Sequence, residues 1–281
     1  MYPENIGENL SIDETAFTNG ELYTIVTNKA AKGKKGTLLA MIKGTKAEDV
    51  VKVLRKLPEE KRLKVKELTL DMAGNMGLIV DRSFPKASKV IDRFHVQKLA
   101  FEAVQEIRIK HRWEAIDLEN KQIQKANDEN EIYKIKEYTN GDSPKQLLAR
   151  SRYLLFKSES KWTEKQKQRA IILFEKYPDI KQAYDLSQRL SWIYQKTEDK
   201  TIARTRLALW IEKVRQSGFK SFNTISNTIN MHYENILNYF DNRSTNASAE
   251  SFNSKIKAFR AQFRGVRDVA FFLFRLENVF A

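Results

Sequence analysis

Residues 68–96, LTLDMAGNMGLIVDRSFPKASKVIDRFHV, decide the fold because they hold two strand patterns and two helix patterns in close succession. The stretch opens with apolar and polar side chains in alternation, which is typical of a strand. That strand runs directly into Asp71, and residues 75–82 then predict a short helix. Phe84-Pro85 ends this helix, because proline cannot continue a helix and restricts the residue before it.

A second short strand pattern, at 89–91, also ends on an acid, Asp92. His95 follows three residues later, where a long helical pattern begins. In an open α/β sheet, ligands bind at the edge where the strands have their carboxyl ends. Asp71, Asp92 and His95 at that edge therefore predict a functional site.

Upstream, the sequence predicts a meander of three strands, at 9–17, 21–27 and 36–42. Asn19-Gly20 is a strong hairpin signal between the first two strands. A helix is expected next, starting at a capping box formed by Thr45 and Glu48 and ending at Pro58. Three strands followed by helix, strand, helix and strand predict a mixed five-stranded α/β sheet of the ribonuclease H-like plan, in which the first and fourth strands are neighbours.

The region from about 95 to 233 carries almost only helical patterns, and its apolar stripes indicate the core of a bundle better than a cofactor site. A short strand at 236–240, ILNYF, is one alternative within the helical region. His111 and His232 lie in helical patterns without matching partners and are interpreted as structural. We expect three parts: a ribonuclease H-like core at 1–110, a large all-helical insertion at 111–240, and C-terminal helices at 241–281 that complete the core.

The composition indicates a folded protein that meets a polyanion. The net charge is +14, from 50 basic and 36 acidic residues, which favours nucleic acid as a partner. The alternative is a lysine-rich surface that serves only solubility. The chain has no cysteine, so disulfides, cysteine-based zinc sites and thiol catalysis are excluded. A polar amino terminus and the lack of a long apolar run predict a cytoplasmic protein without a membrane partner.

A late helical pattern, TNASAESFNSKIKAFRAQFRGVR at 245–267, places Glu250 as a lone carboxylate on a polar face. Five basic residues and no acid follow Glu250 in this segment, which favours contact with DNA phosphates over a merely solvated face. The amides one turn to either side of Glu250 are expected to orient its carboxylate or to touch the DNA strand. The predicted DNA-binding residues are Asn246, Asn253, Lys255, Lys257, Arg260 and Arg264.

Asp13, at the end of the first strand, and Asp71, at the end of the fourth, should lie side by side in this sheet. Two carboxylates held that close are unfavourable unless a cation neutralises them, and Mg²⁺ prefers carboxylate oxygen. Two such ions about 3.5–4 Å apart suit cleavage or transfer of a phosphodiester, with Glu250 completing the second ion's ligands. The alternatives are that Glu14 replaces Asp13, and that Asp71 only caps the following helix.

Four motifs carry a resemblance to a known family: SIDETAF around Asp13, LTLDMAGNM around Asp71, FPKASKVIDRFHVQK around Asp92 and His95, and TNASAESFNSKIKAFR around Glu250. With these motifs the chain resembles the DDE transposases of bacterial insertion sequences, in the ISL-three group, which is related to the Mutator-like transposases. The resemblance covers essentially the whole chain. It implies that Asp13, Asp71 and Glu250 are the catalytic triad and bind the metal ions.

The resemblance further implies an enzyme that uses two Mg²⁺ ions, with Mn²⁺ able to substitute, to cut the ends of its element and join them to target DNA. Element ends and target DNA are the expected partners, with a homo-oligomer forming on DNA of the bacterial nucleoid. Related transposases carry an amino-terminal DNA-binding module. This chain starts twelve residues before Asp13 and has no cysteine, so this module is expected either to be absent or to be supplied by a separate polypeptide, such as one with a helix-turn-helix.

Two other functions stay open from the sequence: a ribonuclease H-like nuclease without strand transfer, and a non-catalytic DNA-binding protein derived from a transposase. Asp92 and His95 also have two interpretations. They are either the N-cap and a first-turn residue of the long helix, or a pair that positions the metal ligands or the scissile phosphate.

Overall fold

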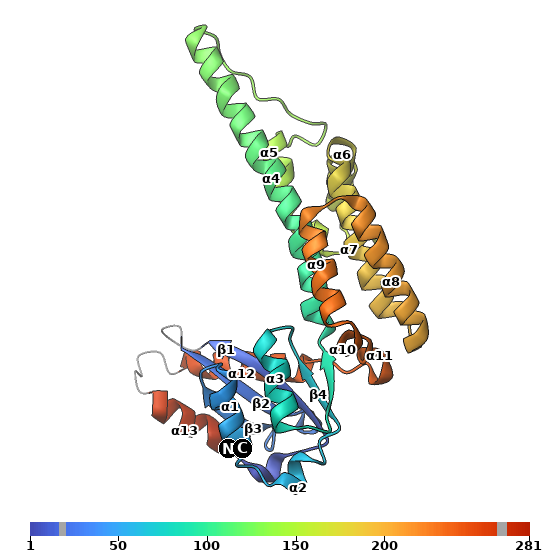
Figure 1. Ribbon diagram of the computed structural model, residues 1–281. Coiled ribbons are helices and arrows are strands. Elements are labelled where there is room, and N and C mark those ends of the chain that lie inside the picture. Colours follow the sequence, from blue (N-terminus) through green and yellow to red (C-terminus); the bar gives the residue numbers. More distant parts are fainter. Residues whose placement is uncertain (17–20, 263–268) are drawn as a thin grey trace. The chain divides into compact units, whose positions relative to one another are not determined.

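A computed structural model describes residues 1–16, 21–262 and 269–281 of the chain (Figure 1). The chain divides into two compact units, a sheet unit of Met1–His95 and His232–Ala281 and a helical unit of Val96–Met231. The expected boundaries at 110/111 and 240/241 thus fall inside these units. The predicted turn at Asn19-Gly20 lies outside the described residues.

The sheet unit is built on a five-stranded mixed sheet with the order β3-β2-β1-β4-β5. β1 pairs with β2, and β2 with β3, in antiparallel fashion, whereas β1 with β4 and β4 with β5 are parallel pairs. The predicted ribonuclease H-like α/β class is therefore confirmed, with the first and fourth strands adjacent. The strands are β1 (Asn9–Ala16), β2 (Leu22–Asn28), β3 (Leu38–Lys43), β4 (Glu67–Leu70) and β5 (Ser88–Ile91).

Short helices connect the strands, as the sequence predicts. The sheet unit contains η1 (Pro3–Asn5), η3 (Lys29–Ala31), α1 (Ala47–Leu54), α2 (Glu59–Arg62), α3 (Gly74–Ser83), α10 (Tyr233–Leu237), α11 (Tyr239–Asn242), α12 (Ala247–Gln262) and α13 (Val269–Phe280). The predicted capping box was wrong, because α1 begins after Lys46, whose side chain makes no capping hydrogen bond. The end of α3 before Phe84-Pro85 agrees with the prediction.

The possible strand at 236–240 was wrong, because this segment is helical in α10 and α11. Ile236 and Asn238 donate their backbone N–H groups to carbonyls four residues earlier in the chain, as in a helix. At the outer edge of β5, a side chain supplies a hydrogen bond to a backbone carbonyl, as a neighbouring strand would. Asn238 Nδ2 donates to the carbonyl oxygen of Lys89 at 2.8 Å, so α10 covers this edge of the sheet.

One face of the sheet is covered by the last two helices. Phe252 and Ile256 of α12 form a buried cluster with strand residues and with α13. The partners in this cluster are Tyr23, Ile25, Leu38, Phe272 and Leu276. Burial of such large apolar side chains is the main force that fixes α12 against β2 and β3, and so fixes the height of its polar residues above the sheet.

The helical unit begins within α4 (Arg93–Asp128), which is one continuous helix across the expected boundary at residue 110. It continues through α5 (Pro144–Arg150), η4 (Leu154–Phe156), η5 (Glu159–Lys161), α6 (Glu164–Lys176), α7 (Pro178–Lys196), α8 (Lys200–Ser217) and α9 (Lys220–Met231). Local signals set several ends: Thr163 and Gln166 form a capping box before α6, and Gly218, at φ 73°, ends α8. Among the helices that the structure describes, none is long and apolar enough to cross a membrane.

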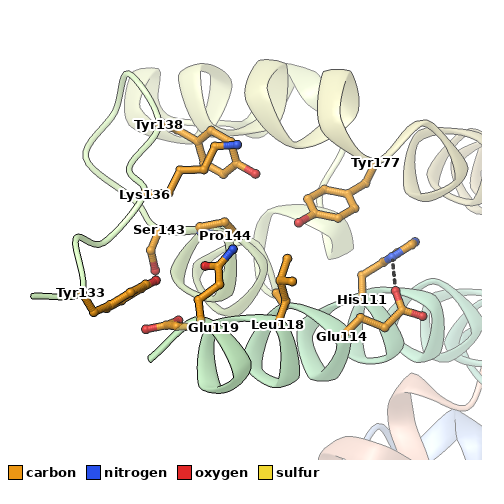
Figure 2. A pocket seen from close by; sticks show the side chains of 12 residues that line it. His111, Glu114, Leu118, Glu119, Tyr133, Lys136, Tyr138, Ser143, Pro144 and Tyr177 are labelled. Carbon is orange, nitrogen blue, oxygen red and sulfur yellow. Dashed lines mark hydrogen bonds and ion pairs between the residues drawn. The ribbon is translucent and has the colours of Figure 1, made fainter. Parts of the chain in front are cut away.

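A pocket of about 300 Å³ in the helical unit contains His111 (Figure 2). The ring nitrogens of His111 lie 3.0 Å from a Glu114 oxygen and 2.6 Å from an Asp179 oxygen. The sequence suggested no partners for this histidine, and the structure provides two. Glu114 lies on α4 together with His111, whereas Asp179 lies on α7, so the His111–Asp179 contact joins the two helices. This arrangement agrees with the structural interpretation of His111.

Candidate catalytic site

The strand register brings three acids into one row across the sheet. The parallel pairings of β1 with β4 and of β4 with β5 include two residue pairs, Ser11–Thr69 and Leu70–Ile91. Asp13 and Asp71 each lie two residues after their members of the first pair. Asp71 and Asp92 each lie one residue after their members of the second pair. Neighbouring strands lie about 4.8 Å apart, so these acids lie side by side at the same level of neighbouring strand segments. This arrangement places Asp71 between Asp13 and Asp92.

Asp13 lies inside β1, within the strand predicted at 9–17, and not at the strand's end, where the sequence analysis placed it. β1 continues to Ala16 by pairing with β2 alone, and Asp13 pairs with Ile25. Paired residues of antiparallel strands share a face, so Asp13 faces the side that α12 covers. Glu14 points to the opposite face of the strand. This geometry supports Asp13 over the alternative Glu14.

Both carboxylate oxygens of Asp13 accept hydrogen bonds. Asn253 Nδ2 donates to Oδ2 at 2.7 Å, and the Glu14 backbone N–H donates to Oδ1 at 2.9 Å. Burial raises the pKa of Asp13 to about 6, against the lowering effect of the Glu14 hydrogen bond. The charge of His95 also lowers this pKa, whereas the charges of Asp71 and Glu250 raise it. Asp13 therefore lies within electrostatic reach of three of the other predicted site residues.

Asp71 holds the turn after β4 and does not cap α3. Its Oδ1 accepts a hydrogen bond from the Ala73 backbone N–H at 2.9 Å, and α3 begins at Gly74. The N-cap position belongs to Ala73, whose side chain makes no capping hydrogen bond. His232 lies near enough for the Asp71 charge to act on its pKa, although burial is the larger influence and lowers that pKa. The structure thus brings His232 near the site, which the sequence gave no reason to expect.

Asp92, His95 and Glu250 form a compact group. One potential metal-ligating atom from each residue lies within 4.8 Å of the other two. Burial raises the pKa of Glu250, the charge of Asp92 raises it further, and His95 opposes the shift. Among the three predicted catalytic acids, Glu250 therefore lies close to Asp92, at the end of the acid row, and is also in electrostatic reach of Asp13.

The two asparagines beside Glu250 face the protein interior. Asn246 is fully buried, and Asn253 is 7% exposed and bound to Asp13. For Asn253 this geometry supports the orienting role over contact with a DNA strand, although the carboxylate that it orients belongs to Asp13 and not to Glu250.

Replacing Asn253 by alanine is expected to lower the free energy of unfolding by about 1.5–3 kcal/mol, because a buried carboxylate loses a charge-assisted hydrogen bond. Urea denaturation in EDTA measures this change, so that no added cation compensates the charge of Asp13. Ser254→Ala, at the exposed neighbouring position, is the matched control. An Asn253→Ala variant as stable as this control would contradict the proposed contact.

The basic residues predicted for DNA have different environments. Lys257 is exposed, and Lys255 is exposed but donates to a backbone carbonyl of the loop after η3 at 2.9 Å. The guanidinium of Arg260 lies 5.0 Å from the centre of a phenylalanine ring of α13. Arg264 lies outside the described residues. Their DNA-binding role stays a prediction.

The role of Lys29, a largely buried lysine at the start of η3, was missed by the sequence analysis. Lys29 Nζ lies 3.1 Å from Glu67 Oε1 and also donates to Thr69 and to Ser244, which precedes α12. Burial lowers the pKa of Lys29, whereas the charges of Glu67 and Asp92 raise it. Lys29 lies in a basic turn of the sequence, and no local pattern indicates that its side chain turns inward. This cluster connects β4 to the segment that precedes α12, the helix that carries Glu250.

A family model described as a transposase, for the ISL-three group of DDE transposases, matches residues 10–276. The chain belongs to this family. The match begins before Asp13 and ends after Glu250, so one family assignment covers the acid row and α12. Transposases of this family cut and transfer DNA, and DDE chemistry uses divalent metal ions. A search of curated proteins found no matching relative.

Proposed function

We propose that this chain is the catalytic core of an insertion-sequence transposase that cleaves DNA at its element's ends and joins the freed ends to target DNA. Asp13, Asp71 and Glu250 are the proposed catalytic acids and metal ligands. The observation that carries this proposal is the acid row, formed by Asp13 in β1 and by the acids directly after β4 and β5, with Glu250 of α12 in electrostatic reach of Asp13 and Asp92.

The residues present fit a pair of divalent cations. Carboxylates on adjacent strands repel each other, and the raised pKa of Asp13 reflects burial together with the neighbouring charges of Asp71 and Glu250. Hard divalent cations such as Mg²⁺ take carboxylate oxygens as ligands, and Mn²⁺ accepts the same donors. When bound, such cations supply Lewis-acid activation of water or of a 3′-hydroxyl and stabilise the leaving oxygen.

The chain itself contributes preorganised ligand positions. Asn253 and the Glu14 N–H fix the two oxygens of Asp13, and the Ala73 N–H fixes one oxygen of Asp71. Asp13 and Asp71 are therefore oriented in advance of the reaction, which is the condition for electrostatic stabilisation of a transition state. Nucleophiles are water in the cleavage step and the 3′-hydroxyl of the cut end in the joining step, so no covalent link to the protein forms.

The basic residues after Glu250 are proposed to hold the DNA backbone next to the acids. Element ends and target DNA in the bacterial nucleoid are the proposed partners, with a homo-oligomer assembling on them. A helix-turn-helix polypeptide is proposed as a further partner that reads the end sequence, because phosphate contacts position a duplex without reading its sequence.

A strand-transfer assay tests the proposed function. The assay incubates the chain with a divalent metal salt, a supercoiled plasmid and duplex oligonucleotides that carry pre-cut element ends. Joined oligonucleotide–plasmid products are expected. Hydrolysis without joined products would instead support the nuclease alternative, and absence of both activities would support the non-catalytic one.

Lys257→Ala is expected to weaken DNA binding about equally for all sequences and to reduce the slope of log K against log salt by about 1, because one phosphate contact is lost. Fluorescence anisotropy over a range of salt concentrations measures both quantities. Lys64→Ala is the matched control, since Lys64 is also exposed but precedes β4 at the opposite edge of the sheet from Asp71. An unchanged salt slope for Lys257→Ala would remove this residue from the DNA interface.

A further inference from the structure

We infer that Asp92, His95 and Glu250 together bind one divalent cation directly, and that this site prefers Mn²⁺ to Mg²⁺. The inference rests on the proposed function only for the use of that cation in DNA chemistry. It gives Asp92 and His95 a different role from the positioning pair or helix-cap residues expected from the sequence.

The spacing of the three side chains fits one cation. Two ligand atoms about 2.1 Å from the same ion lie at most about 4.2 Å apart. The ligand atoms of Asp92, His95 and Glu250 lie within 4.8 Å of one another, so small side-chain rotations close the shell. Two different elements supply them, the β5–α4 junction and the first turn of α12.

The environment of Asp92 provides a second, independent reason. This carboxylate is 1% exposed, and one oxygen, Oδ2, has no hydrogen-bond partner among the described residues. Burying an unpaired carboxylate oxygen is costly, and a cation at the site removes that cost. The other oxygen accepts a long hydrogen bond from the Phe94 backbone N–H at 3.4 Å.

Capping of α4 does not account for this arrangement. A helix N-cap needs only one side-chain oxygen, and Asp92 already has one directed at the first turn. Capping does not explain why the second oxygen of Asp92 is buried without a partner. It also does not explain why Glu250, whose carboxylate repels that of Asp92, lies so close to it. A shared cation accounts for both features and makes the neighbouring imidazole a ligand.

The donor set determines the preferred metal. Mg²⁺ favours oxygen ligands and usually keeps several waters, whereas an imidazole nitrogen suits transition metals. Two carboxylates and one imidazole therefore favour Mn²⁺ over Mg²⁺. Asp13 and Asp71 offer oxygen ligands alone, so a cation at the Asp13 end of the row has a different set of ligand atoms from one at the Asp92 end.

Pulsed electron paramagnetic resonance of the DNA-free chain with MnCl₂ tests this inference. A bound imidazole gives a nitrogen modulation of the Mn²⁺ echo, and the chain has three histidines, His95, His111 and His232. The modulation is expected in the unmodified chain, in His111→Gln and in His232→Gln, and is expected to disappear in His95→Gln. Modulation that survives in His95→Gln, or is missing from the unmodified chain, overturns the inference.

Titrations of the free Mn²⁺ signal give a second readout. We expect Asp92→Asn and Glu250→Gln each to weaken one Mn²⁺ site at least tenfold, and His95→Gln to weaken Mn²⁺ binding more than Mg²⁺ binding. Circular dichroism establishes that each variant is folded. Equal Mn²⁺ affinity in the folded Asp92→Asn chain overturns the inference. Because no DNA is present, these results are independent of whether the chain joins DNA ends.

Discussion

Replacing Asp71 by asparagine is expected to reduce DNA strand transfer by about 10³-fold or more while leaving the fold intact. Asp71 occupies the middle of the acid row, so its charge acts on both ends of the proposed metal site. Metal-ion catalysis contributes several kcal/mol to transition-state stabilisation, and each 1.36 kcal/mol corresponds to a factor of ten in rate. Asparagine keeps a side-chain oxygen that can accept from the Ala73 N–H, so the turn after β4 survives.

Single-turnover joining of pre-cut ends to a plasmid measures this effect. Asp81→Asn is the matched control, because Asp81 lies on α3 in the same segment but is 58% exposed and paired with Lys89. The control should retain the rate of the unmodified chain. An Asp71→Asn variant within a factor of ten of the unmodified rate would exclude Asp71 as a catalytic metal ligand.

The sheet could be predicted because its signals are local. Alternation of apolar residues gave each strand within a few residues of its observed bounds, and the order of strands and helices gave the adjacency of β1 and β4. Those two facts alone place Asp13 beside Asp71. The strand predicted at 9–17 already includes Asp13, but the sequence does not show that pairing with β2 alone sustains β1 after pairing with β4 has ended.

Local sequence patterns could not predict that Glu250 lies close to Asp92 and His95. The sequence correctly placed Glu250 on a polar helix face, but the point where that helix crosses the sheet depends on Phe252 and Ile256 packing against β2, β3 and α13. The strand suggested at 236–240 failed for a similar reason, since the Asn238 side chain occupies the edge of β5. Both outcomes depend on contacts between residues far apart in the sequence.

Replacing Lys29 by methionine is expected to destabilise the sheet unit by about 3–5 kcal/mol, because it leaves Glu67 buried without its partner cation. The side chains of Lys29 and Glu67 are 13% and 7% exposed. The second oxygen of Glu67 accepts a hydrogen bond from Asn242 Nδ2 at 3.3 Å. A Glu67 carboxylate without its cation would therefore also disturb α11, in the segment before α12. Lys66→Met is the matched control, since Lys66 and Glu8 form an exposed pair, for which a loss of about 0–1 kcal/mol is typical.

Amide hydrogen exchange of β1 and β4 is the appropriate measurement, because all four tryptophans lie in the helical unit and their fluorescence does not report on the sheet. The double variant Lys29→Met/Glu67→Gln should recover much of the lost protection, since it removes the unpaired charge. Lys29→Met with the protection of the Lys66→Met control would refute a buried ion pair. If the prediction holds, the Lys29 cluster couples the stability of β4 to the position of Ser244 and hence of Glu250. The position of α12, which carries Glu250, would then depend on the Lys29–Glu67 ion pair as well as on the packing of its apolar face.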